Sequence, residues 1–184
     1  MNKWAAAFID CLLLLLLVMV IVPHRPDVSR ETPQVDIFSK VIIGARWPDS
    51  MTADVDLWVR APGDTTVGYS RTRGNIASLA WDDVGNVSAP PWRYEVVLVR
   101  QGADGEYVVN LHCYRCPTMI LPVPVKVVVW RRTPQGESEI WSGDIKLVAE
   151  GQELTVVRFE LRNGDLIPGS IHQRPMQLRA ARSP

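Results

Sequence analysis

An apolar segment near the start of the chain constrains its fold more than any other feature. Residues 11–22 have the sequence CLLLLLLVMVIV and carry no charge. Extended back to Trp4, the apolar stretch covers 19 residues and is interrupted once, by Asp10. At about 1.5 Å per residue, a helix of this length matches the roughly 30 Å hydrocarbon core of a bilayer. The segment therefore predicts a transmembrane anchor over residues 1–22, ended by Pro23 and Pro26.

A cleaved signal peptide is the alternative interpretation of the same residues. Lys3 supplies a minimal positive start, and 12 apolar residues are enough for the core of a signal. No small-x-small cleavage site follows, however, and an acidic residue at the head of a signal core is unusual. A retained anchor in a bacterial inner membrane is favoured, with the N-terminus in the cytoplasm and the remaining chain in the periplasm.

Asp10 is the most informative residue of the predicted anchor. A carboxylate at the centre of a spanning helix costs about 2.5–3.5 kcal/mol, so such residues usually face a partner or a water path. Asp10 lies only about two turns from the start of the segment, so one interpretation is a tolerated charge that reaches the interface. The other is an ion-carrying carboxylate in a proton-driven complex.

The residues from Phe8 to Val20 resemble the single helix of the ExbD/TolR family and, more distantly, that of MotB. The shared pattern is Phe or Leu, then Ile or Val, then Asp and a leucine-rich run. Two such helices sit inside a pentamer of an ExbB/TolQ/MotA-like membrane protein. The resemblance implies that Asp10 carries protons in a homodimeric motor subunit. This chain lacks the Pro that often precedes the family's Asp, and only three residues precede Trp4.

Charge and motifs exclude several function classes. Lys and Arg number 20 and Asp and Glu also number 20, whereas nucleic-acid binders normally carry a basic excess. The sequence contains no nucleophile elbow, no H-E-x-x-H and no glycine-rich phosphate loop, so we expect no enzyme. Basic residues near the end of the chain predict a solvated tail over residues 166–184. They are Arg174, Arg179 and Arg182.

The rest of the chain has the pattern of an antiparallel β-sandwich. Residues 23–36 are polar, contain three prolines and predict a linker. Beyond it, short apolar runs alternate with polar residues and are separated by turn sequences. Such spacing predicts a sandwich of about seven strands over residues 37–165. The expected strands are 37–46, 55–60, 94–100, 107–113, 123–131, 140–149 and 154–161.

The segment from Asp54 to Gly63 resembles an uncharacterised bacterial β-sandwich family typified by YfaP, whose pattern is D-x-D-L-x-V-x-x-P-x-G. Further residues of the family's pattern occur in the same order, and at approximately the same spacing, over about residues 42–130. This resemblance implies a fold and a loop pattern but no established chemistry. The same strand is a weaker match to the D-L-D-L strand of the TerD calcium-binding family.

Four aspartates of this region form a candidate calcium site. Asp54 and Asp56 lie on the same side of one predicted strand, and Asp82 and Asp83 follow in a loop. Carboxylate oxygens are the ligands that Ca²⁺ prefers. The alternative is that Asp54 and Asp56 form the solvent face of a half-buried strand. Several tryptophans are expected to fill the core rather than bind sugar; they are Trp58, Trp81, Trp92, Trp130 and Trp141.

Cys113 and Cys116 form a single C-x-x-C pair behind a predicted strand. One pair is too small for a four-ligand zinc site, and a redox pair would be expected at the start of a helix. The remaining interpretations are a local disulfide in an oxidising compartment or two free thiols, and we predict the disulfide, as a local clip without a catalytic role. A disulfide requires the chain to turn between the cysteines, because bridged Cα atoms lie about 4.4–6.8 Å apart.

Two functions follow as hypotheses. The first is a single-pass subunit of a proton-driven motor, in which Asp10 carries the ion and the periplasmic sandwich grips an envelope or cell-wall target. The second is a membrane-anchored envelope module that binds calcium or glycan, with Asp10 incidental.

Overall fold

The computed structural model describes residues 40–85, 92–134 and 136–179. The predicted anchor with Asp10, the predicted linker and residues 37–39 lie outside this part of the chain. Within it, no helix is both long and apolar enough to cross a membrane.

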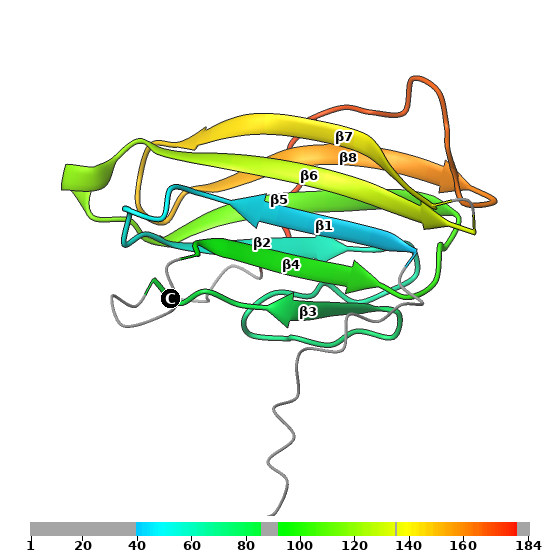
Figure 1. Ribbon diagram of the computed structural model, residues 1–184, viewed down its shortest axis with the longest axis horizontal. Coiled ribbons are helices and arrows are strands. Elements are labelled where there is room, and N and C mark those ends of the chain that lie inside the picture. Colours follow the sequence, from blue (N-terminus) through cyan, green and yellow to red (C-terminus); the bar gives the residue numbers. More distant parts are fainter. Residues whose placement is uncertain (1–39, 86–91, 135, 180–184) are drawn as a thin grey trace, which may run out of the picture. The chain divides into compact units, whose positions relative to one another are not determined.

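Nine strands in the described residues form two antiparallel sheets (Figure 1). Sheet A has the strand order β3-β4-β1-β6-β7, and sheet B has the order β2-β5-β8-β9. This architecture is consistent with the predicted β-sandwich. All seven expected strands are present, and β3 and β9 are additional. The strands are β1 Val41–Arg46, β2 Asp54–Arg60, β3 Ala77–Trp81, β4 Tyr94–Val99, β5 Gly105–Arg115, β6 Val123–Thr133, β7 Gly136–Leu147, β8 Glu153–Arg162 and β9 Asp165–Leu166.

The core lies between the two sheets, because alternate residues of each strand point inward. From sheet A it receives four buried valines of β6, at positions 123, 125, 127 and 129. From sheet B it receives Leu57 of β2 and Leu111 of β5, which pair directly. The rings of Tyr107 and Phe159 stack in the same core at a centroid distance of 4.9 Å. Burial raises the pKa of Tyr107 to about 12.

The tryptophans follow the expected pattern only in part. Trp141 packs against the core, and Trp81 stacks on Tyr94 with ring centroids 5.3 Å apart. Trp58 is buried, but it lies on the outer side of β2, where it contacts Tyr69 edge-on. The expectation is wrong for Trp92, whose side chain is 59% exposed.

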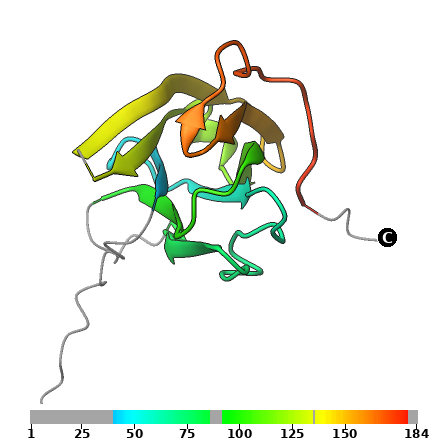
Figure 2. The same ribbon diagram turned by 90° about the vertical axis from the view of Figure 1, so that its right-hand side faces the viewer.

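The prediction of a solvated tail over residues 166–184 is incomplete, because part of this segment packs on sheet B although Arg174 is exposed. His172 forms two backbone hydrogen bonds with Arg158 of β8. The carbonyl oxygen of Met176 accepts hydrogen bonds from Asn110 at 2.7 Å and Thr155 at 3.1 Å. These contacts hold the segment against the outer face of sheet B (Figure 2). The sequence pattern missed this packing because the segment has no β alternation of its own.

The connection between β2 and β3 is organised by the carboxylate of Asp64. Its two oxygens accept hydrogen bonds of 2.7–2.9 Å from four backbone N–H groups. Burial alone would raise the pKa of Asp64, but these donors together hold it below its usual value. The carboxylate sits so close to Gly74 that a Cβ there would lie 2.6 Å from its oxygens. Asp64 therefore substitutes for regular strand pairing in this loop. The donors belong to Thr65, Asn75, Ile76 and Ala77.

Replacing Asp64 by Ala should lower the free energy of unfolding by about 2 kcal/mol at neutral pH, because four N–H groups lose a charged acceptor. The folded-state pKa is depressed, so the contribution is present above the unfolded-state pKa and disappears as pH falls through the folded-state value. Urea unfolding at pH 7 and at progressively lower pH measures the difference. Asp104→Ala is the matched control, since Asp104 accepts one N–H, from Asn163. A difference between wild type and Asp64→Ala that does not shrink in acid would contradict this role.

Candidate metal centre

Three carboxyl groups meet where the free edge of β2 in sheet B faces β4 of sheet A. They belong to Asp56 of β2, to Asp82 directly after β3, and to Glu95 of β4. One oxygen of each lies within 4.8 Å of the others. We call these three residues the carboxylate trio. They come from three separate segments of the sequence, and the fold brings them together.

Asp54 and Asp56 do share the outer side of β2, because Val55, Leu57 and Val59 point into the core. They do not form a solvent face, however. Asp54 is 7% exposed and Asp56 is 3% exposed. The interpretation as the wet side of a half-buried strand is therefore wrong.

Glu95 is the member of the trio that sequence analysis missed. It is 1% exposed and occupies a core-facing position of β4, on the same face of the strand as the core valines 97 and 99. Its Oε2 accepts the backbone N–H of Leu57 at 2.5 Å, so it caps the free edge of β2. Its Oε1 is buried and accepts no N–H group of the described residues. Burial, followed by a hydrogen bond with the carboxyl group of Asp82, raises the pKa of Glu95 well above its usual range.

The other two predicted ligands have cationic partners instead. Oδ1 of Asp83 accepts hydrogen bonds from Arg93 at 2.9 Å and from the N–H of Gly85 at 2.8 Å. Oδ2 of Asp54 lies 3.6 Å from the guanidinium of Arg115. Burial and the nearby Asp56 nevertheless raise the pKa of Asp54 to about 6. The predicted set of four aspartates is therefore divided, and Asp56 and Asp82 join Glu95.

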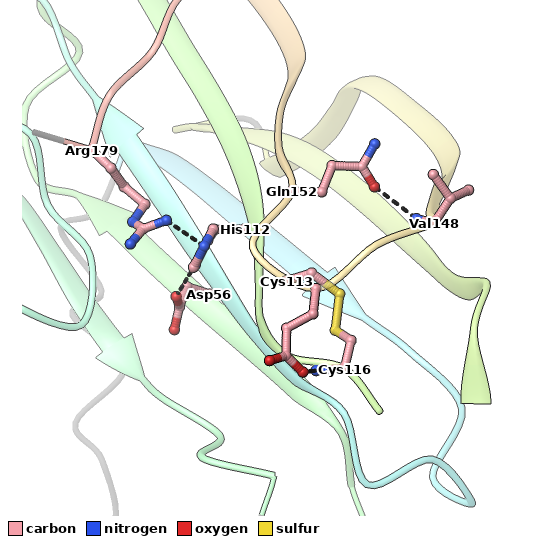
Figure 3. The surroundings of a disulfide bond; sticks show 8 residues. Asp56, His112, Cys113, Cys116, Val148, Gln152 and Arg179 are labelled. Atoms are coloured by element: carbon pink, nitrogen blue, oxygen red, sulfur yellow. Dashed lines mark hydrogen bonds and ion pairs between the residues drawn. A yellow bond between two sulfur atoms is a disulfide. The ribbon is translucent and has the colours of Figure 1, made fainter. Parts of the chain in front are cut away.

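Asp56 is oriented by a buried histidine (Figure 3). His112 of β5 pairs with Asp56 in the strand register, and its Nδ1 lies 2.7 Å from Asp56 Oδ2. On its other side, Nε2 contacts a guanidinium nitrogen of Arg179 from the C-terminal segment. An arginine can only donate, so we assign Nε2 as an acceptor and Nδ1–H as the donor to Asp56. Burial raises the pKa of Asp56 although the hydrogen bond from His112 lowers it.

The trio has the donor chemistry of a site for a hard divalent cation. All three ligands are carboxylate oxygens, which suit Ca²⁺, Mg²⁺ or Mn²⁺. Calcium–oxygen distances of about 2.3–2.6 Å allow two oxygens on opposite sides of the ion to lie roughly 5 Å apart. A maximum separation of 4.8 Å fits that span. Backbone carbonyls and water would complete the coordination of such an ion.

The two cysteines lie close to this centre. Cys113 and Cys116 are joined by a disulfide, with their Cα atoms 5.8 Å apart (Figure 3). Cys113 pairs through its backbone with Gln152 and Gly151, and the N–H of Cys116 donates to Glu150. The disulfide therefore ends β5 against the turn between β7 and β8.

Glu95→Gln should stabilise the cation-free protein at neutral pH. Because the folded-state pKa of Glu95 is raised, wild-type stability falls as pH rises from the unfolded-state value near 4.5 through the folded-state value. Glutamine keeps the acceptor for Leu57 without the buried charge. Thermal unfolding in EDTA at pH 4 and pH 7 tests this: the two proteins should differ little in acid, and the variant should unfold at a higher temperature at pH 7. A less stable variant at pH 7 would show that the charge of Glu95 is already compensated.

Comparisons with protein-family models, with curated proteins and with solved structures found no match to this chain. The resemblances of residues 8–20 and 42–130 stay predictions.

Proposed function

We propose that the described domain is a divalent-cation-binding module, with Ca²⁺ as the favoured ion. An N-terminal anchor predicted over residues 1–22 would hold it at the periplasmic side of a bacterial inner membrane, where it binds an envelope target. The observation that supports the cation most directly is the buried Oε1 of Glu95. Among the described residues no N–H group donates to it, and it belongs to a carboxyl group clustered with those of Asp56 and Asp82.

Buried carboxylates without compensation destabilise a fold, and the protein has two ways to relieve this. The groups can take up protons, which is what the raised pKa of Asp56 and that of Glu95 express. Alternatively, a cation can bind among them, which would lower those pKa values and provide Oε1 with a partner. Near neutral pH, the second solution leaves the carboxyl groups of Asp56 and Glu95 ionised.

A cation at the trio would also have a structural role. The two sheets are not hydrogen-bonded to one another where β2 and β4 face each other, apart from side-chain contacts such as that of Glu95. One ion bound by Asp56, Asp82 and Glu95 would connect the edge strand of sheet B to β4 and to the end of β3. The expected result is a cation-stabilised sandwich.

The donor set selects among cations. The trio offers no thiolate, and both ring nitrogens of His112 have partners, Asp56 and Arg179. Zinc and copper prefer nitrogen and sulfur ligands, so they fit this centre less well than calcium.

Calcium should raise the thermal unfolding temperature of the full chain. An ion that binds only the native state at a hundredfold excess over its Kd stabilises by about 2.7 kcal/mol, or roughly 5–10 °C for a protein of this size. Calorimetry in detergent with EDTA, Ca²⁺ or Mg²⁺ measures the shift. Glu95→Gln should lose most of it. Asp144→Asn, which removes an exposed carboxylate of β7, should keep it. No shift with millimolar Ca²⁺, or an equal shift in Glu95→Gln, would refute binding at the trio.

The motor role is a separate proposal for the predicted anchor. It rests on the pattern from Phe8 to Val20, in which Asp10 precedes a leucine-rich run. If it holds, Asp10→Asn abolishes complementation of a strain that lacks this gene, while the variant still copurifies as a dimer with a polytopic ExbB/TolQ-like protein. Asp27→Asn, in the predicted linker, is the control. Full complementation by Asp10→Asn would exclude the proton-carrying role.

A further inference from the structure

The two residues enclosed by the disulfide, Tyr114 and Arg115, line a groove beside the carboxylate trio. The groove has a volume of about 660 Å³, and its other lining residues include Thr52 and Asp54. Asp54 connects the two sites, because its carboxyl group interacts electrostatically with those of Asp56 and Asp82.

The disulfide bends the end of β5 and turns these two side chains outward. Cys113 and Cys116 are buried, whereas Tyr114 is 45% exposed and the Arg115 side chain is 57% exposed. A separation of 5.8 Å between the cysteine Cα atoms replaces the roughly 10 Å of an extended strand. Closing so short a loop removes little entropy from the unfolded chain. The main consequence of the bridge is therefore local: it fixes where Tyr114 and Arg115 project.

Contacts with neighbouring residues also fix the positions of both side chains. The ring of Tyr114 lies 5.7 Å from that of Tyr69 and 6.1 Å from that of His112, measured between centroids. Arg115 donates to the carbonyl oxygen of Val84 at 2.8 Å and faces the Asp54 carboxylate at 3.6 Å. An exposed ring and an exposed guanidinium are thus presented in a fixed arrangement, with the Asp54 carboxylate largely buried beside the guanidinium.

The chemistry of this groove matches a sugar better than a charged ligand. Arg115 and Asp54 balance each other, so an anion would meet Asp54 and a cation would meet Arg115. A guanidinium, a carboxylate and the hydroxyl of Thr52 together offer donors and acceptors to neighbouring hydroxyl groups. The negative face of an aromatic ring attracts the slightly positive C–H groups on the face of a sugar ring. The volume lies within the range of small-ligand sites.

We propose that this groove binds a carbohydrate segment. Tyr114 stacks on one sugar ring, Arg115 and Asp54 bond to its hydroxyl groups, and the Cys113–Cys116 disulfide preorganises the pair. This inference rests on the proposed role as a binding module, but it requires no ion at the trio.

The full chain, kept in a detergent without a sugar headgroup, is tested on a printed glycan array that includes peptidoglycan fragments. Isothermal titration with the strongest array glycan then gives the affinity. Tyr114→Ala should weaken binding at least about tenfold, as expected for truncation of a central aromatic contact. Tyr114→Phe, which keeps the ring, should bind within a fewfold of wild type. Trp92→Ala removes another exposed ring outside this groove and should change nothing.

The disulfide is tested with the Cys113→Ser/Cys116→Ser double variant. It should keep the β circular dichroism spectrum and lose affinity severalfold. If that variant does not fold, Tyr114→Ala still decides the matter, because both cysteines remain.

Absence of binding anywhere on the array, or full affinity in Tyr114→Ala, would overturn the proposal. Binding of an unglycosylated peptide at the same residues would instead assign the groove to peptides. Repeating the titration in EDTA separates the two proposals, since glycan binding that persists there stands even if calcium fails to bind.

Discussion

The hydrogen bond from the backbone N–H of Leu57 to the buried carboxylate of Glu95 is the contact on which the candidate site depends. Strand β2 is an edge strand, so its outer N–H groups need a partner from outside sheet B. Glu95 reaches across from sheet A and supplies one. A neutral side chain could accept the same bond, but a carboxylate also introduces a buried charge. The surrounding residues can be understood as the response to that charge.

Arginine and histidine side chains pair with three of the acidic residues around Glu95. Arg93 faces Asp83, Arg115 faces Asp54, and His112 donates to Asp56 with Arg179 behind it. The C-terminal segment contributes Arg179, and its contact with His112 is one of several that hold the segment on sheet B. The oxygens of Asp56, Asp82 and Glu95 remain close together, and we assign to them a cation. The groove beside the disulfide includes Asp54, whose carboxyl group interacts electrostatically with those of Asp56 and Asp82.

The strands were predictable because their residues alternate over five or more positions, as the valines of β6 do. β3 was not, since its sequence ASLAW has little β-branched character, and β9 has only two residues. The common side of Asp54 and Asp56 followed from the same periodicity. Their burial did not, because residues distant in sequence, such as Arg179, pack against that side of sheet B. Glu95 was the largest omission: a single acid in YEVVLV fits a solvent-facing position equally well unless the strand's neighbours are known. Its core-facing alternation with valines 97 and 99 was the available signal.

The central claim is that one cation binds between the carboxyl groups of Asp56, Asp82 and Glu95. Anomalous diffraction from crystals of the protein grown with Mn²⁺, or with Tb³⁺ in place of Ca²⁺, locates such an ion directly. We expect one strong anomalous peak within about 2.6 Å of an oxygen from each of the three residues. A map without a peak at the trio, in crystals that hold the ion elsewhere, would contradict the account and would leave shared protons as the state of these carboxyl groups.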